Sequence, residues 1–289
     1  MARVAAVLLG LMLSQSAASF DLQGHRGARG HAPENTLAGF ERALAIGVDT
    51  LELDVGVTRD GVVVIHHDRR LNPDLARGPD GKWVSAPAPT IHSLSYPELQ
   101  RYDVGRIRPN SEYAQRFPHQ KPIDGTRIPK LEELFAKTRA GKVRFNIETK
   151  LVPEAPEEAP APEPFARALI AEVRKAGVAA RTTIQSFDFR TLAVVQREAP
   201  EIATAYLTSG KKGDGMPRMV HEAKGRIWSP NFQDLEPDAL AVARELGIKV
   251  IPWTVNEPAD IARVLEMRVD GIISDYPDRV REALKSWRP

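Results

Sequence analysis

Residues 21–55, DLQGHRGARGHAPENTLAGFERALAIGVDTLELDV, contain a helical pattern between two short segments that we expect to be strands. The run 50–55 predicts a strand because it is short and alternates apolar with polar residues, and the segment 21–26 is expected to be a strand from its place before the helical pattern. The segment 36–46 predicts a helix, because its large apolar side chains recur at helical spacing. A strand, a helix and a second strand in this order are typical of a parallel sheet with helical crossovers.

The same alternation continues to the end of the chain. A second clear helical pattern covers 237–246, and six further strands are expected, at 143–148, 182–186, 202–207, 226–230, 249–254 and 271–274. Eight such units in about 250 residues favour a (β/α)₈ TIM barrel over an open doubly wound sheet. The glycine-rich fingerprint of dinucleotide folds is also missing, since Gly24, Gly27 and Gly30 are evenly spaced by three. We therefore expect residues 20–289 to form one barrel domain.

Three segments interrupt the alternation. The runs 55–58 and 62–66 flank Arg59-Asp60-Gly61, and an Asp-Gly pair favours the tight turn of a β-hairpin. Residues 69–127 are rich in Pro, Gly and Asn and show only one short helical pattern, at 96–102, so they predict an insertion on the rim of the barrel. Residues 152–164 alternate Pro, Ala and Glu, which predicts a polyproline-like or mobile solvated spacer.

The N-terminal residues 1–19 differ from the rest of the chain. Arg3 precedes an apolar run at 4–13 and a small, polar stretch at 14–19, which is the order of a secretory signal peptide. No later apolar run approaches the length that a membrane-spanning helix needs. The sequence thus predicts an exported protein, periplasmic or secreted, with no integral membrane segment after signal cleavage.

Charge and cysteine content exclude several classes of protein. The formal net charge is only +2, from 40 basic and 38 acidic residues without a long run of one sign, so nucleic acid is not an expected partner. The chain has no cysteine, which excludes disulfides, thiolate chemistry and zinc sites built on sulfur. Any metal site must therefore use oxygen or imidazole ligands.

Two acidic side chains lie on one face of a predicted strand. Glu52 and Asp54 are two residues apart, so both point to the same side, while their apolar neighbours face the helices. Glu148 ends the strand 143–148 and can join them at the mouth of the barrel. Carboxylates this close are costly without positive charge, and an all-oxygen set favours one hard divalent cation, Ca²⁺ or Mg²⁺. Salt bridges to Arg26 or Lys150 are the alternative reading.

Two histidines end elements that lead to the same mouth. His25 and Arg26 end the first strand, and His67 ends the hairpin, so the two imidazoles can reach the mouth from opposite sides. Such a pair suits general acid and base catalysis on a phosphodiester. Arg26 and Lys150 would stabilise the charge of the phosphate. His66 is expected to face away, because side chains alternate along a strand.

The order and spacing of these motifs resemble those of the glycerophosphodiester phosphodiesterase family. The resemblance covers nearly all of the chain after the predicted signal peptide. The shared motifs are HRG at 25–27, PENT at 33–36, LELDV at 51–55, TRDG at 58–61, HD at 67–68, IPKLEE at 128–133, NIETK at 146–150, QSF at 185–187, WTVN at 253–256 and DGIISDYP at 270–277.

The resemblance implies a TIM barrel with a small insertion after the His-Asp pair. It implies that His25 and His67 act as acid and base, that Arg26 and Lys150 contact the phosphate, and that the acids bind the metal. The three implied metal ligands are Glu52, Asp54 and Glu148. The substrate would be a small glycerophosphodiester, hydrolysed to sn-glycerol 3-phosphate and an alcohol, either through a cyclic phosphate or by direct attack of water.

Weaker expectations concern the ends of other strands. Gln185, Phe187 and Trp253 can line the pocket for the alcohol, although aromatic residues at such positions also serve as plain core. Asn35 is expected to cap the first helix.

Three other functions fit parts of the sequence. A phospholipase C-like or sphingomyelinase D-like barrel would need an apolar surface for the membrane, and the start of the insertion is polar. A noncatalytic phosphodiester-binding protein would lack an imidazole or an acid, and none is missing from the set. A glycoside hydrolase would use the paired carboxylates but leave both histidines and Arg26 without a role. The sequence leaves the head group, the choice between Ca²⁺ and Mg²⁺ and the oligomeric state open.

Overall fold

The computed structural model describes residues 20–210 and 213–288. The predicted signal peptide at 1–19 lies outside this part of the chain. Among the described residues, no helix is both long and apolar enough to cross a membrane.

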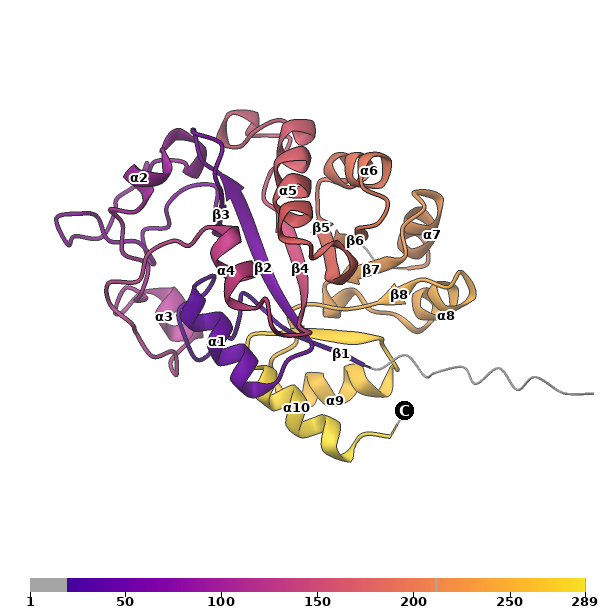
Figure 1. The fold of residues 1–289 in the computed structure, drawn as a ribbon. Helices are drawn as coiled ribbons and strands as arrows, with labels where there is room; N and C mark the ends of the chain where they lie inside the picture. The colour runs from indigo at the N-terminus through magenta and orange to yellow at the C-terminus, as the bar shows by residue number, and fades with distance from the viewer. Residues whose placement is uncertain (1–19, 211–212, 289) are drawn as a thin grey trace, which may run out of the picture.

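The centre of the molecule is a ring of eight parallel strands (Figure 1). In chain order they are β1 (Asp21–Gly24), β2 (Thr50–Val57), β4 (Arg144–Thr149), β5 (Thr182–Ser186), β6 (Ala203–Thr208), β7 (Ile227–Pro230), β8 (Lys249–Val250) and β9 (Gly271–Ser274). Their spatial order is β8-β7-β6-β5-β4-β2-β1-β9. The two ends of the sheet meet through backbone hydrogen bonds, from Ile273 N to Pro252 O (3.0 Å) and from Val255 N to Ile273 O (3.0 Å). The predicted TIM barrel is confirmed.

The strand expected at 249–254 is shorter than predicted. Only β8 (Lys249–Val250) is regular, and Pro252 follows it closely. Proline has no N–H to donate to a neighbouring strand, so regular pairing stops there. The chain nevertheless continues beside β7, since Trp253 N donates to Pro230 O (3.0 Å).

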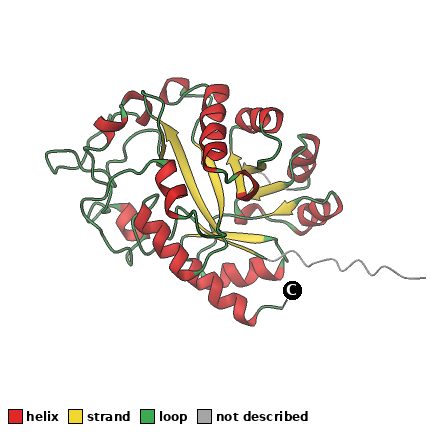
Figure 2. Ribbon diagram, in the orientation of Figure 1, coloured by secondary structure: helices red, strands yellow, loops and turns green. Residues whose placement is uncertain are grey.

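Helices surround the ring on the outside (Figure 2). They are α1 (Leu37–Ile46), α4 (Leu131–Lys137), α5 (Pro162–Ala176), α6 (Phe189–Glu198), α7 (Gly215–Glu222), α8 (Pro237–Glu245), α9 (Pro258–Glu266) and α10 (Pro277–Ser286). The helices predicted at 36–46 and 237–246 are present as α1 and α8. Thr36 caps α1, because its hydroxyl accepts from Gly39 N (3.1 Å). The cap expected at Asn35 is therefore wrong by one residue.

The alternation along β2 separates the core from the mouth. Leu51, Leu53 and Val55 are fully buried and belong to the main hydrophobic core, together with Phe145 and Ile147 of β4. Their neighbours on each strand point into the barrel. Burial of the apolar face against the helices thus fixes where the acidic face of β2 must lie.

The hairpin and the insertion project from the end of β2. β3 (Val63–Ile65) pairs antiparallel with β2, as the Asp-Gly turn predicts. The insertion contains a 3₁₀ turn (Ile91–Ser93), α2 (Tyr96–Leu99) and α3 (Glu112–Arg116), and it has a small hydrophobic core of its own. The short helix α2 matches the pattern at 96–102, but α3 was not expected. In Figure 1 the insertion lies to the left of the barrel.

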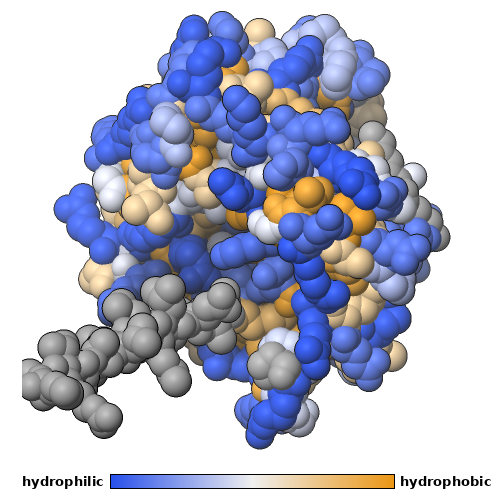
Figure 3. Space-filling model, turned by 90° about the vertical axis from the view of Figure 1, so that its right-hand side faces the viewer, coloured by the Kyte–Doolittle hydropathy of each residue, from blue (hydrophilic) through white to orange (hydrophobic). Residues whose placement is uncertain are grey.

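Residues 152–161 form a loop whose side chains are exposed or half-buried, as expected, with one 3₁₀ turn at Pro156–Glu158, but residues 162–164 belong to a helix and were wrongly included in the loop. Helix α5 begins at Pro162, since proline suits the first turn of a helix. Glu158 accepts from Arg69 Nε (2.7 Å) and Arg70 Nε (2.6 Å), so the segment ties the barrel to the start of the insertion. The face on the right of Figure 1, away from the insertion, is mostly hydrophilic with an apolar patch near its centre (Figure 3).

Candidate active site

A cavity of about 190 Å³ opens where the C-terminal ends of the strands meet the insertion. All of the predicted site residues except Asp54 line it, and Asp54 is buried beside it. The lining residues are His25, Arg26, Arg29, Glu52, His67, Arg116, Glu148, Lys150, Gln185, Phe187, Leu207, Trp253, Thr254 and Ile273. In TIM barrels this end of the strands is the end that carries active sites.

The three predicted acids form one buried cluster. Glu52, Asp54 and Glu148 each offer a carboxylate oxygen, and these oxygens all lie within 4.8 Å of one another. The parallel register explains this, because β2 and β4 place Asp54 directly beside Glu148. Burial and the neighbouring Asp54 raise the pKa of Glu52 well above its usual range, and burial raises the pKa of Glu148 to about 7. The cluster carries more negative charge than its surroundings favour.

The hydrogen bonds of the cluster leave room for a cation. Glu52 accepts from Gln185 Nε2 (2.7 Å) and from Arg26 N (2.9 Å), so both its oxygens are held in place. Asp54 Oδ2 accepts from Asn35 Nδ2 (2.9 Å), but Asp54 Oδ1 is buried without a hydrogen-bond partner. An unsatisfied carboxylate oxygen in an all-oxygen cluster fits a hard divalent cation.

His25 is held by a carboxylate from the far end of the chain. Its Nδ1 lies 2.6 Å from Asp275 Oδ1, and its Nε2 lies 3.9 Å from Glu52 Oε2. Burial lowers the pKa of His25 to about 4, although Asp275 acts in the opposite direction. The imidazole is therefore neutral near pH 7. Because Asp275 stays ionised, the proton of His25 is on Nδ1, and Nε2 is free to accept another.

Asp275 lies in the shared motif at 270–277, but the sequence analysis did not assign it to the site. It follows β9 and accepts from Arg29 Nε (2.8 Å), Arg29 Nη2 (3.0 Å) and Asn256 Nδ2 (2.7 Å). Arg29 overcomes the effect of burial and holds the pKa of Asp275 far below its usual range. One signal was present, since Asp275 is a polar residue directly after a barrel strand, where site residues gather.

His67 has a similar arrangement on the other side of the cavity. Its Nδ1 lies 2.7 Å from Asp68 Oδ1, and Asp68 Oδ2 accepts from Asn72 Nδ2 (2.8 Å). This leaves His67 Nε2 on the side away from Asp68. His66 is buried but does not line the cavity. Each imidazole of the site is thus oriented by one carboxylate.

Two cations lie against the acids. Arg26 Nε is 3.2 Å from Asp54 Oδ2, and Lys150 Nζ is 2.7 Å from Glu148 Oε1 and 3.7 Å from Asp54 Oδ1. Burial disfavours the charge on Asp54, but His67, Arg26 and Lys150 hold its pKa well below its usual range. The salt bridges suggested by the sequence therefore exist, and they offset only part of the charge of the three acids.

The insertion contributes directly to the site. Tyr113 of α3 donates a hydrogen bond to Glu34, which also accepts from Arg26 Nη1 (2.7 Å). The guanidinium of Arg29 lies 4.5 Å from the centre of the Phe117 ring. These contacts dock α3 against the first loop and bring Arg116 to the cavity. Sequence reasoning placed none of these insertion residues in the site.

Aromatic side chains form the opposite wall. The rings of Phe187 and Trp253 meet edge to face with their centres 5.5 Å apart, and Phe187 is 44% exposed. Gln185 lies below them, with its Nε2 on Glu52 and its Oε1 accepting from Asn146 Nδ2 (2.9 Å). Both polar atoms of Gln185 are thus bound within the protein, and the aromatic rings face the cavity.

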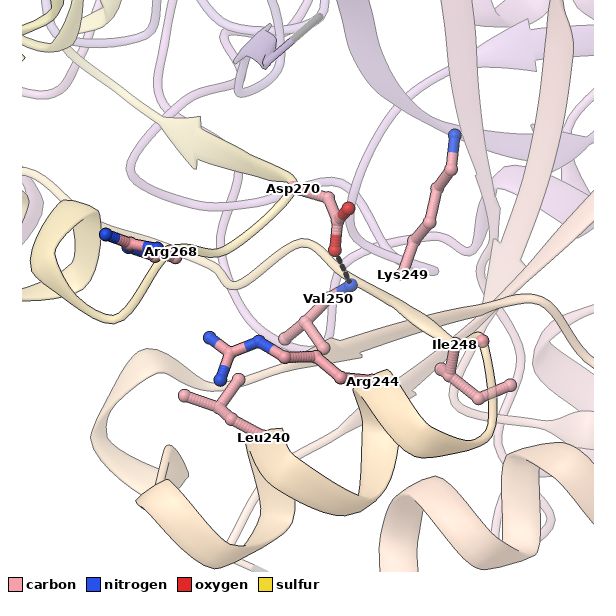
Figure 4. Close-up of a pocket in the computed structure, with 8 residues that line it drawn as sticks. Leu240, Arg244, Ile248, Lys249, Val250, Arg268 and Asp270 are labelled. Carbon is pink, nitrogen blue, oxygen red and sulfur yellow. Dashed lines mark hydrogen bonds between the residues drawn. The ribbon is translucent and has the colours of Figure 1, made fainter. Parts of the chain in front are cut away.

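A second hollow lies at the opposite, N-terminal end of the strands (Figure 4). Its cations are Arg244, Lys249 and Arg268, and Lys249 and Arg268 point away from each other. Asp270 is already used, since it accepts from Val250 N (2.8 Å). This hollow brings no reactive groups together.

Comparison with known proteins gives a consistent result. The sequence model of the Glycerophosphoryl diester phosphodiesterase family matches residues 25–279. A glycerophosphodiester phosphodiesterase of Bacillus subtilis (strain 168) is 30% identical over 279 residues, which cover 91% of this chain and 86% of the relative. A crystal structure from Silicibacter pomeroyi DSS-3 is 36% identical with a TM-score of 0.88, over 94% of this chain and 96% of that one. An Oleispira antarctica phosphodiesterase, solved with the product sn-glycerol-3-phosphate, shares the fold (TM-score 0.74, 23% identity, 92% of this chain and 97% of that one).

Proposed function

Since the chain belongs to the glycerophosphoryl diester phosphodiesterase family and is thereby a phosphoric diester hydrolase, we propose that it hydrolyses small glycerophosphodiesters to sn-glycerol 3-phosphate and an alcohol. We also propose that this reaction depends on a divalent cation. One observation carries the proposal. Two imidazoles, each oriented by an aspartate, face one cavity beside a buried cluster of three carboxylates.

The acids and the cations have separate tasks in the proposed reaction. Glu52, Asp54 and Glu148 would hold Ca²⁺ or Mg²⁺, which supplies positive charge to polarise the phosphoryl group when bound. Arg26 and Lys150 line the same cavity and would contact the phosphate oxygens. Gln185 would act mainly by holding Glu52, and Phe187 and Trp253 would contact the organic part of the substrate.

The imidazoles carry the proton transfers in this proposal. His25 Nε2 accepts a proton from the attacking hydroxyl, and the imidazolium that forms is stabilised by Asp275. His67 must start as the imidazolium to give its Nε2 proton to the oxygen of the leaving alcohol. Burial lowers the pKa of His67, and the negative charges of Asp68 and of the bound phosphate would offset this effect. The attacking hydroxyl belongs either to water or to the glycerol. If it belongs to the glycerol, a cyclic phosphate forms first and is then hydrolysed. A substrate whose glycerol 2-hydroxyl is replaced by hydrogen distinguishes the two routes, because it cannot form the cyclic phosphate and only direct attack of water can hydrolyse it.

The purified full chain tests the proposal with glycerophosphocholine and phosphatidylcholine vesicles as alternative substrates. We expect release of sn-glycerol 3-phosphate from glycerophosphocholine, its loss in EDTA, and its recovery when Ca²⁺ or Mg²⁺ is added back. His25→Ala and His67→Ala should abolish release with unchanged circular dichroism, whereas the control His119→Ala, an exposed histidine outside the cavity, should not. Preference for vesicles, or full activity in EDTA or in either site variant, would contradict the proposal.

The location of the protein in the cell is a separate proposal. The sequence of residues 1–19 supports export to the periplasm or the medium. Cell fractionation, together with sequencing of the N-terminus of the mature protein, tests this directly. Recovery of the full-length chain in the cytoplasm would overturn it.

A further inference from the structure

Four cationic side chains line the cavity, and three of them are ion-paired. Arg26 Nη1 lies 2.7 Å from Glu34 Oε1, Arg29 Nε lies 2.8 Å from Asp275 Oδ1, and Lys150 is paired with Glu148 as described above. The fourth is Arg116, which forms no ion pair with any carboxylate of residues 20–210 and 213–288.

Arg116 is placed at the cavity by the way α3 docks. Tyr113 and Phe117, on either side of it in sequence, bind Glu34 and Arg29 of the first loop. The guanidinium of Arg116 lies 5.6 Å from the ring centre of Tyr113 and 5.7 Å from that of Phe117. The two rings give the guanidinium a cation–π platform that leaves its N–H groups free for a ligand.

The position of Arg116 separates it from the reacting phosphate. The groups of the reaction centre lie deeper than Arg116, since His25 is 9% and Glu148 is 7% exposed and His67 is half-buried, whereas Arg116 is exposed at the rim. A phosphate held between the imidazoles and the acids would lie among the buried groups. Arg116 would then meet the part of the substrate that projects out of the cavity.

We propose that Arg116 determines specificity by binding an anionic group, a carboxylate or a phosphate, on the alcohol part of the substrate. This inference rests on the proposed hydrolysis of glycerophosphodiesters and names the substrates that are preferred. A guanidinium binds either anion through two parallel hydrogen bonds. A rim that carries an unpaired cation also makes a purely cationic head group, such as choline, a poorer substrate than a head group with a carboxylate, without preventing its cleavage.

Two substrates that differ by one carboxylate test the inference. Glycerophosphoserine carries this carboxylate, and glycerophosphoethanolamine lacks it. We expect the wild type to cleave the serine substrate with the higher kcat/KM. In Arg116→Ala this kcat/KM should fall about fivefold, through KM, which corresponds to roughly 1 kcal/mol. The value for the ethanolamine substrate should change by less than about twofold.

Two further variants control for charge and for geometry. Arg108→Ala removes the same charge from the insertion at an exposed position that does not line the cavity. The ratio of its kcat/KM values for the serine and ethanolamine substrates should therefore equal that of the wild type. Arg116→Lys keeps the charge but lacks the planar, two-pronged guanidinium, so its kcat/KM for the serine substrate should lie between the values of the wild type and the alanine variant.

The outcomes separate this inference from the function on which it rests. If the wild type with added cation cleaves neither substrate, the proposed function is wrong, and the inference with it. If the wild type cleaves both substrates and Arg116→Ala keeps the wild-type ratio of the two kcat/KM values, the inference alone is overturned. An equal loss on both substrates would also overturn it, because Arg116 would then bind the phosphate that both share.

Discussion

Replacing Asp275 by asparagine should remove most of the activity while keeping the shape of the side chain. The carboxylate receives hydrogen bonds from His25, twice from Arg29, and from Asn256. An amide at this position can donate to His25 Nδ1, which would move the imidazole proton to Nε2 and remove the acceptor. Proton transfer by a positioned side chain contributes roughly 10²- to 10⁴-fold, and we expect kcat to fall within this range.

The same change should weaken the fold, because Arg29 keeps its charge in a buried position. Breaking a buried ion pair by removing one partner costs about 3–5 kcal/mol. Asparagine retains one acceptor, and Tyr113 still binds Arg29 (3.2 Å), so the loss of unfolding free energy should lie at or below the lower end of that range. Urea denaturation of both proteins measures this difference.

Asp278→Asn is a matched control three residues further along the chain. Asp278 pairs with His31 (2.7 Å), but its side chain is 44% exposed and lies outside the cavity. We expect an unchanged kcat and a loss of less than about 1 kcal/mol. If folded Asp275→Asn kept kcat within about threefold of the wild type, the role assigned to Asp275 in orienting His25 would be refuted.

Two predictions concern stability. Ca²⁺ or Mg²⁺ at 100 times its Kd should raise the free energy of unfolding by about 2.7 kcal/mol, which denaturation with and without the cation measures. The variant Asp54→Asn should lose most of this gain, and an equal gain in the variant would contradict the cation site. The pKa of His25 is about 4 in the folded state against 6.5 as its ordinary value, so between pH 4 and 6.5 the unfolded chain binds the additional proton, and His25 contributes a loss of stability of up to about 3 kcal/mol as the pH falls through this window. Glu52 and Glu148, whose pKa values are raised in the fold, act in the opposite direction, so the contribution of His25 is measured as the difference in pH dependence between the wild type and His25→Asn, and no difference would argue against a buried neutral imidazole.

Local periodicity was sufficient to locate the acids. Glu52 and Asp54 share a strand with a two-residue pattern, so their common face follows from the sequence, and the barrel then brings Glu148 to the same mouth. The barrel itself followed from the repeated alternation of strands and helices. Proline was a less reliable signal, because Pro162 begins a helix although the segment around it had been predicted as a spacer.

The residues that orient the catalytic side chains could not be predicted, because they make their contacts with residues far away in the sequence. His25 and Asp275 are 250 positions apart, and no periodic pattern indicates that they meet. The helix that carries Tyr113 and Arg116 has only five residues, too few for a reliable apolar pattern, and it is located by its docking on Glu34. Tertiary contacts, rather than local preference, place these residues.

The bond between His25 and Asp275 also bears on the order of events when the chain is made. Strand β1 pairs with β9, so the first imidazole gains its carboxylate only after the last strand has been synthesised and has closed the ring. Contacts between such distant residues form late, since a long loop must be closed first. A chain that ends before residue 275 would carry both histidines and all three acids and still lack the group that sets the proton on His25. Enzymatic turnover would therefore report that β9 and Asp275 have been made and the ring has closed, and chains that end before residue 275 would have little activity.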